Sequence, residues 1–101
     1  MNREETIKEL IKQQLRKAAP KLKGYKIVLF GSRVTGKAHD RSDFDVGIVG
    51  DRPIGLRTFY EIDNLMESIE TLYRIDLVDL NRAAPALKRE ALKAVEPLYD
   101  G

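Results

Sequence analysis

The order of two short apolar segments around a glycine–serine corner constrains the fold of this chain more than any other feature. Residues 25–30 are apolar and rich in β-branched side chains, and they end at Gly31 and Ser32. Such a run, with a glycine at each end, predicts a buried strand. After ten intervening residues, residues 43–49 alternate between two kinds of side chain, which predicts a second strand with two different faces.

The other segments alternate between helical and extended patterns. Helical spacing of apolar residues, closed by Pro20, predicts the first helix. This first helix covers residues 4–19. The remaining predicted elements are a short helix or turn over 32–38, a helix over 56–72, a strand over 74–80, and a helix from Pro85 to about Val95, followed by a tail at 96–101. The order α-β-α-β-α-β-α predicts an α/β fold with a small sheet and flanking helices, in one domain over residues 1–101.

Composition excludes several classes of protein. The 18 Lys and Arg against 16 Asp and Glu leave a net charge of +2, which gives no argument for direct nucleic-acid binding. The absence of cysteine excludes disulfides and thiol chemistry. No apolar run approaches the roughly 20 residues of a membrane span, and the N-terminus does not resemble a signal peptide. We therefore expect a cytoplasmic protein without a membrane segment.

Two carboxylates at the start of the second strand are the first candidates for a functional site. Asp43 and Asp45 are two residues apart, so they share a face while Phe44 points to the core. Neighbouring carboxylates repel each other unless a cation lies between them, and Mg²⁺ with oxygen ligands is the usual solution. The Gly31–Ser32 corner offers backbone N–H groups to a phosphate. The combination indicates nucleotide chemistry.

A third carboxylate is expected from the strand at 74–80, where Asp76 and Asp79 lie on opposite faces. Asp79 is near the strand end, where a solvated or helix-capping carboxylate is ordinary, and Asp76 interrupts an apolar run. We therefore select Asp76. Beside Asp43 and Asp45 it would complete a ligand set for two Mg²⁺ ions, and it also suits a general base near the nucleophile.

Residues around the corner have weaker signals. Gly31 could simply end a strand and Ser32 could be a helix N-cap, but the downstream aspartates favour phosphate binding for both. Arg33 is included as a nucleotide-binding candidate because its charge could offset phosphate. Lys37 and Arg41 are ordinary loop cations, and the single histidine, His39, is expected to be solvated.

These residues resemble a known signature. Gly31-Ser32, ten intervening residues, Asp43-x-Asp45 and the later Asp76 are similar to the pattern of polymerase-β-like nucleotidyltransferases, which have a small mixed sheet. The short length and the ending Leu98-Tyr99-Asp100 resemble the minimal nucleotidyltransferase (MNT) branch. The resemblance implies that Gly31 and Ser32 hold the triphosphate of ATP, that Asp43 and Asp45 bind the metals, and that Asp76 is the third carboxylate.

The resemblance also implies a partner. Larger relatives add a helical domain over the nucleotide, and in the MNT branch the neighbour is often a helical HEPN-domain ribonuclease toxin. The implied activity is that of an antitoxin, which transfers AMP from ATP to a tyrosine of the toxin. Two alternatives stay open: transfer to a small hydroxylated molecule, and a non-catalytic partner that inhibits by occlusion.

One wall of the expected cleft is missing from so short a chain. A second protein or a homo-oligomer would have to supply it. We therefore expect the apolar residues of the C-terminal segment to be partly exposed or in an oligomer contact; these are Leu92, Val95, Leu98 and Tyr99.

Overall fold

The computed structural model, which describes residues 3–39 and 41–101, contains a four-stranded sheet in the order β3-β2-β1-β4. The strands are β1 (Lys26–Phe30), β2 (Phe44–Val49), β3 (Ile75–Asp79) and β4 (Glu96–Asp100). β1 is antiparallel to both β2 and β4, and β2 is parallel to β3. The predicted mixed sheet with flanking helices is confirmed.

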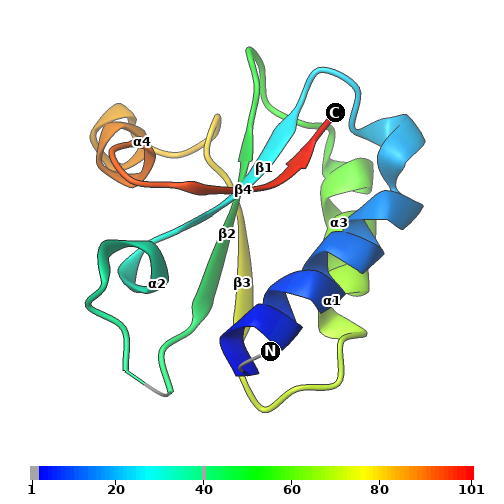
Figure 1. Cartoon of the computed structure of the whole chain (residues 1–101). Helices are drawn as coiled ribbons and strands as arrows, with labels where there is room; N and C mark the ends of the chain where they lie inside the picture. The colour runs from blue at the N-terminus through cyan, green and yellow to red at the C-terminus, as the bar shows by residue number, and fades with distance from the viewer. Residues whose placement is uncertain (1–2, 40) are drawn as a thin grey trace.

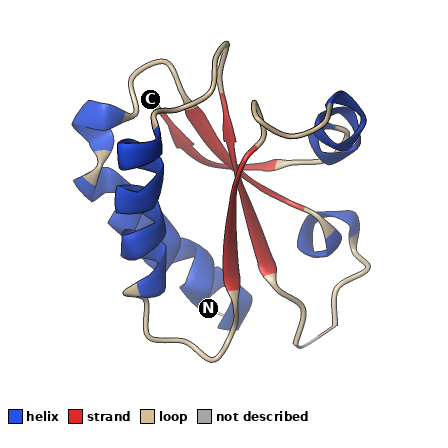
Figure 2. Ribbon diagram, turned by 180° about the vertical axis from the view of Figure 1, so that it is seen from behind, coloured by secondary structure: helices blue, strands red, loops and turns tan. Residues whose placement is uncertain are grey.

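Helices cover both faces of the sheet. They are α1 (Arg3–Lys17), a 3₁₀ turn η1 (Ala19–Lys21), α2 (Ser32–Thr35), α3 (Leu56–Glu67) and α4 (Pro85–Leu92). The sheet is seen on edge in Figure 1, with α1 and α3 on one face and α2 and α4 on the other. The view from behind in Figure 2 shows the same division. No helix in residues 3–39 or 41–101 combines the length and apolar character needed to cross a membrane.

Strand alternation places the apolar side chains as the sequence predicts. Phe44, Val46 and Ile48 of β2 are fully buried in the larger core, on the sheet face that α1 and α3 cover. A smaller core of Val28, Leu80 and Ala91 lies on the face of α4. The side chain of Asp45, between Phe44 and Val46, therefore points to the α2 and α4 face, where the smaller core lies.

The C-terminal segment differs most from the sequence prediction. Residues 96–101 were expected to be a tail, but they include β4, which pairs with β1 at the sheet edge. Pro97 argues against a central strand, and an edge strand tolerates it because one side of the ladder is unpaired. Leu98 is only 6% exposed and belongs to the main core. The expectation that Leu98 is partly exposed or in an oligomer contact was therefore wrong.

The other three residues of that expectation have mixed positions. Val95 and Tyr99 are half-buried against the two cores, whereas Leu92 at the end of α4 is 39% exposed. β4 is part of the sheet and is therefore not the surface on which a partner would supply the missing wall of the cleft.

The helices α3 and α4 both end earlier than predicted. α3 ends at Glu67, five residues before the predicted end, and α4 ends at Leu92 rather than Val95. After α3, the Ser68 hydroxyl donates to the Leu65 carbonyl, and the Tyr73 N–H donates to the Thr71 hydroxyl. Hydroxyl side chains that bond to nearby backbone compete with helical hydrogen bonds, which accounts for the early end of α3.

Candidate active site

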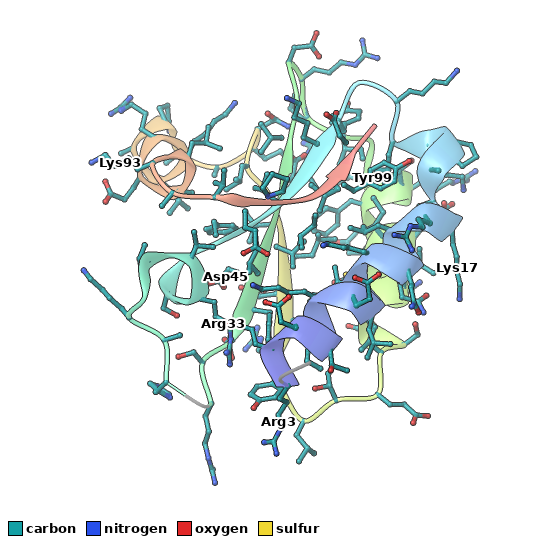
Figure 3. The ribbon with its side chains drawn as sticks, viewed as in Figure 1. Arg3, Lys17, Arg33, Asp45, Lys93 and Tyr99 are labelled. Carbon is teal, nitrogen blue, oxygen red and sulfur yellow. The ribbon has the colours of Figure 1, made fainter. Side chains whose placement is uncertain are left out.

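The sheet register brings two of the predicted carboxylates together. Asp45 of β2 is directly opposite Asp76 of β3 in the parallel pair, and neighbouring strands are about 4.8 Å apart. Both residues are half-buried, and because they alternate with Phe44 and Leu77 of the larger core, their side chains point to the other face of the sheet, which α2 and α4 cover in Figure 1. Asp43 is exposed and precedes β2 by one residue. The side-chain view in Figure 3 shows Asp45 between β2 and the corner that leads into α2.

The Gly31 backbone lies against the Asp45 carboxylate. Phe30, at the end of β1, is the register partner of Asp45, so the next residue turns over the end of that pair. Gly31 has a φ of +80°, and a Cβ built on it would overlap Asp45 Oδ2. Both the positive φ and the close approach require glycine here. Ser32 begins α2 directly after this glycine, which is itself the N-cap.

The clustered carboxylates change the acid–base behaviour of Asp45. Burial raises the pKa of Asp45, and the negative charges of Asp76 and Asp43 raise it further. Each cause disfavours the charged form. The site therefore carries negative charge that this part of the chain does not fully compensate, which favours a bound cation.

The carboxylates do not form a complete metal site by themselves. Among the residues that the structure describes, no three Asp, Glu, His or Cys side chains are arranged to hold a metal ion. Hard cations such as Mg²⁺ accept carboxylate and phosphate oxygens together, and usually bind through one or two carboxylates plus substrate phosphates. The donor set of Asp43, Asp45 and Asp76 fits that mode of binding, in which nucleotide oxygens supply the remaining ligands.

Arg33 does not join this group. Its Nε and Nη2 atoms donate to the Ser42 carbonyl at 3.1 and 2.6 Å, and Nη1 donates to Glu4 Oε1 at 3.2 Å. The guanidinium also lies over the ring of Phe44, at 4.1 Å from its centroid. Phe44 belongs to the core under α1 and α3, so the Arg33 head group is on the opposite side of the sheet from Asp45.

Asp79 was expected to be a solvated or helix-capping carboxylate, but it is buried and binds the chain before α3. Asp79 is 5% exposed, and its carboxylate accepts hydrogen bonds from Ile54 N, Asn81 N and Asn81 Nδ2 at 3.0, 3.0 and 3.1 Å. Arg82 Nε lies 3.4 Å from Asp79 Oδ2. This carboxylate joins the end of β3 to the loop before α3. It is on the opposite face from Asp76, as the strand alternation predicts.

The weaker loop candidates lie outside the carboxylate group. His39 is exposed in a turn, where its backbone N–H donates to the Ser42 hydroxyl and its Nδ1 accepts from Arg41 N. Lys37 lines a hollow of about 520 Å³ between α2 and α4, which Gly31 and Ser32 also line.

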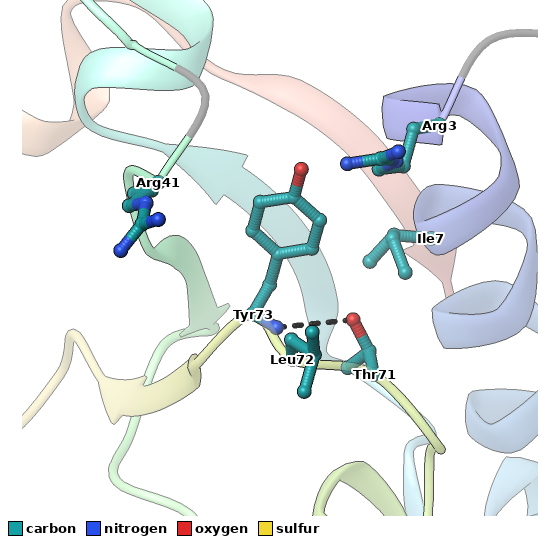
Figure 4. Close-up of a pocket in the computed structure, with 6 residues that line it drawn as sticks. All are labelled: Arg3, Ile7, Arg41, Thr71, Leu72 and Tyr73. Atoms are coloured by element: carbon teal, nitrogen blue, oxygen red, sulfur yellow. Dashed lines mark hydrogen bonds between the residues drawn. The ribbon is translucent and has the colours of Figure 1, made fainter.

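A separate hollow lies at the start of α1. Arg41 and Arg3 line it together with Tyr73, and its volume is about 710 Å³. Figure 4 shows the Tyr73 hydroxyl pointing between the two arginines. None of the predicted site residues lines this hollow.

Comparisons with known proteins agree with the fold. The family described as "Polymerase beta, Nucleotidyltransferase" matches residues 5–101. A comparison with curated protein sequences found no match.

Several solved structures are similar to this chain. A chain of a toxin–antitoxin complex with AMP-PNP superimposes with a TM-score of 0.62 at 22% identity, covering 89% of this chain and 73% of that one. A chain from the complex of the tri-AMPylated Shewanella oneidensis HEPN toxin with MNT antitoxin gives a TM-score of 0.60 at 20% identity, covering 93% and 73%. A minimal nucleotidyltransferase gives 0.60 at 24% identity, covering 92% and 93%. At these identities the similarity establishes a shared fold.

Proposed function

The chain belongs to the polymerase-β nucleotidyltransferase family, and from this premise we propose that it transfers AMP from Mg²⁺-bound ATP to a protein hydroxyl. The proposed acceptor is a tyrosine of a HEPN-type ribonuclease toxin, which the modification would neutralise in the cytoplasm. In this proposal the chain is the antitoxin of the pair.

One observation carries the catalytic part of the proposal. Asp45 faces Asp76 across a parallel strand pair, and the Gly31 backbone contacts the Asp45 carboxylate. A phosphate held at the Gly31–Ser32 corner would therefore lie next to the carboxylates, where a metal can bind both. A purely structural role would not explain why a glycine corner and a pair of carboxylates lie next to each other.

Each residue has a defined part in the proposed reaction. Gly31 and Ser32 bind the triphosphate through backbone N–H groups at the start of α2. Asp43, Asp45 and Asp76 would hold two Mg²⁺ ions, which would neutralise phosphate charge and orient the leaving pyrophosphate. Asp76 would accept the proton of the acceptor hydroxyl. The hydroxyl oxygen then bonds to the α-phosphorus, and the bond from that phosphorus to pyrophosphate breaks.

The proposed partner is supported by similar structures. One is a toxin–antitoxin complex with AMP-PNP, and another contains a tri-AMPylated HEPN toxin with an MNT antitoxin. Both superimpose on about nine-tenths of this chain. A chain of the same family and fold is therefore compatible with a HEPN-type acceptor.

Labelled ATP tests the proposal directly. The chain would be incubated with α-labelled ATP, Mg²⁺ and a co-expressed HEPN-domain protein, and the label located by gel and mass spectrometry. We expect label on a tyrosine of the partner. Asp45→Asn and Asp76→Asn should each reduce the transfer rate by several powers of ten, because each removes a charge that holds the metals.

Asp51→Asn is a matched control for these variants. Asp51 is exposed beyond the opposite end of β2, so its substitution removes the same charge away from the cluster and should leave the rate unchanged. Label on a small hydroxylated molecule would replace the protein acceptor in the proposal. No label with any acceptor, together with inhibition of the partner by simple binding, would refute the enzymatic reading.

A further inference from the structure

Arg33 links the glycine–serine corner to the start of the carboxylate strand. It follows Ser32 directly in sequence, and two of its nitrogens donate to the carbonyl of Ser42, at 3.1 and 2.6 Å. Ser42 is the residue immediately before Asp43. The same peptide unit that accepts these hydrogen bonds therefore sets the direction in which the chain enters Asp43.

The guanidinium is held by more than this carbonyl. The Arg33 side chain is 8% exposed, and its Cζ is 4.1 Å from the ring centroid of Phe44 and 5.1 Å from that of Tyr73. The two rings pack edge to face, with centroids 5.5 Å apart. A planar guanidinium suits this stacked position, and the flexible ammonium of lysine would not reproduce it.

Glu4 of α1 binds the remaining arm of the guanidinium. Glu4 Oε1 accepts from Arg33 Nη1 at 3.2 Å, and Glu4 Oε2 is 3.8 Å from the buried ammonium of Lys8. Lys8 also pairs with Glu5 and with Glu96, the first residue of β4. A buried cation needs such a carboxylate partner. The first helix is therefore connected through Glu4 and Arg33 to the backbone before Asp43.

We propose that Arg33, oriented by Glu4, is a positioning residue that fixes the backbone before Asp43 and does not bind the nucleotide itself. The inference rests on the proposed function only for the use of Asp43 as a metal ligand. To reach a phosphate, the guanidinium would have to leave its two aromatic rings, the Ser42 carbonyl and Glu4 together.

Three substitutions separate positioning from charge neutralisation. Arg33→Ala removes both charge and geometry, whereas Arg33→Lys keeps the charge and loses the planar fork. Glu4→Gln weakens the support of Arg33 from a helix on the other face of the sheet. Glu5→Gln is the matched control, since Glu5 contacts the same Lys8 but is not the carboxylate that binds Arg33.

Kinetics well below each melting temperature are the first readout, with α-labelled ATP and the co-expressed HEPN-domain acceptor. Misplacement of a reacting group by about 1 Å costs roughly 100-fold in rate. We expect kcat to fall about 100-fold in Arg33→Ala and nearly as far in Arg33→Lys, with KM for ATP changed less than about threefold, and the Mg²⁺ concentration for half-maximal rate to rise. Glu4→Gln should show the same pattern with about a tenfold loss, and Glu5→Gln should match wild type.

A second readout does not depend on transfer. In ¹H–¹⁵N NMR spectra, the amide signals of Ser42 and Asp43 should shift in Arg33→Lys and Glu4→Gln and stay in place in Glu5→Gln. If these shifts occur but the wild-type protein transfers no AMP, the proposed function is refuted and the positioning role of Arg33 still stands. Near-normal kcat in Arg33→Lys with a raised KM for ATP in Arg33→Ala would overturn the inference. So would Glu4→Gln behaving like Glu5→Gln in both readouts.

Discussion

Replacing Asp79 by asparagine should weaken the fold and leave the chemistry intact. The Asp79 carboxylate is 5% exposed, and its two oxygens accept from different groups. Oδ2 receives the N–H of Ile54, and Oδ1 receives the backbone N–H and side-chain amide of Asn81. Asparagine has one acceptor oxygen and one NH₂ group. Whichever way the amide turns, its NH₂ group faces a donor that loses its partner.

The cost follows from those hydrogen bonds. A buried donor without a partner costs about 1–3 kcal/mol, and the remaining hydrogen bonds lose the assistance of the negative charge. The ion pair with Arg82, at 3.4 Å, is lost as well; because that arginine is largely exposed, it adds little. We expect Asp79→Asn to lower the free energy of unfolding by about 3 kcal/mol, which for a domain of this size lowers Tm by roughly 12–24 °C.

Asp76→Asn is the paired variant, because it removes the same charge from the same strand on the other face. It relieves repulsion with Asp45 across the strand pair, so its Tm without metal should equal or exceed that of wild type. Thermal and urea unfolding followed by circular dichroism would give both stabilities, and AMP transfer would be measured below the lower Tm. At that temperature Asp79→Asn should transfer AMP at a rate within a few-fold of wild type, whereas Asp76→Asn should not. The reasoning fails if Asp79→Asn melts like wild type, or if Asp76→Asn is the less stable of the two.

Three shorter predictions concern the corner and the charges. Gly31→Ala should lose most activity and more stability than Gly36→Ala, because both glycines have φ of +80° but only at Gly31 would a Cβ meet another group, the Asp45 carboxylate; equal losses in melting and transfer assays would contradict this. The raised pKa of Asp45 means that the folded state binds its proton more tightly, so wild type loses stability as pH rises through that pKa. Asp45→Asn should therefore melt above wild type at pH 7 without metal, and the difference should vanish near the ordinary aspartate pKa of about 4; a difference independent of pH would count against it. ATP should bind much more tightly with Mg²⁺ than without, since the carboxylates alone give an incomplete ligand set; equal affinities by calorimetry would argue against the shared metal site.

Local pattern predicted the face on which each carboxylate lies but not the extent of every element. Alternation around Phe44 was sufficient to place Asp45 away from the core, and the same rule separated Asp76 from Asp79. β4 was missed because Pro97 and a single strongly apolar residue, Leu98, give no strand signal by themselves. Its formation depends on the unpaired edge of β1, which lies some 70 residues earlier in the chain. Edge pairing of this kind is a long-range property that no local window contains.

The roles of two charged residues near the motif, Asp79 and Arg33, depend on groups that are distant in the sequence. An aspartate or arginine beside a functional motif can serve the ligand or the fold, and sequence spacing is the same in both cases. What decides is whether distant groups need its charge. Ile54 N–H needs an acceptor, and Asp79 supplies it; the Ser42 carbonyl and Glu4 need donors, and Arg33 supplies them. Asp45 is the opposite case, because burial raises its pKa and the negative charges of the neighbouring Asp76 and Asp43 raise it further. A charged group whose neighbours satisfy it holds the structure together, whereas a group whose neighbours repel it is left to bind something else, and that difference supports the proposal that the Asp45 and Asp76 face is the reactive one.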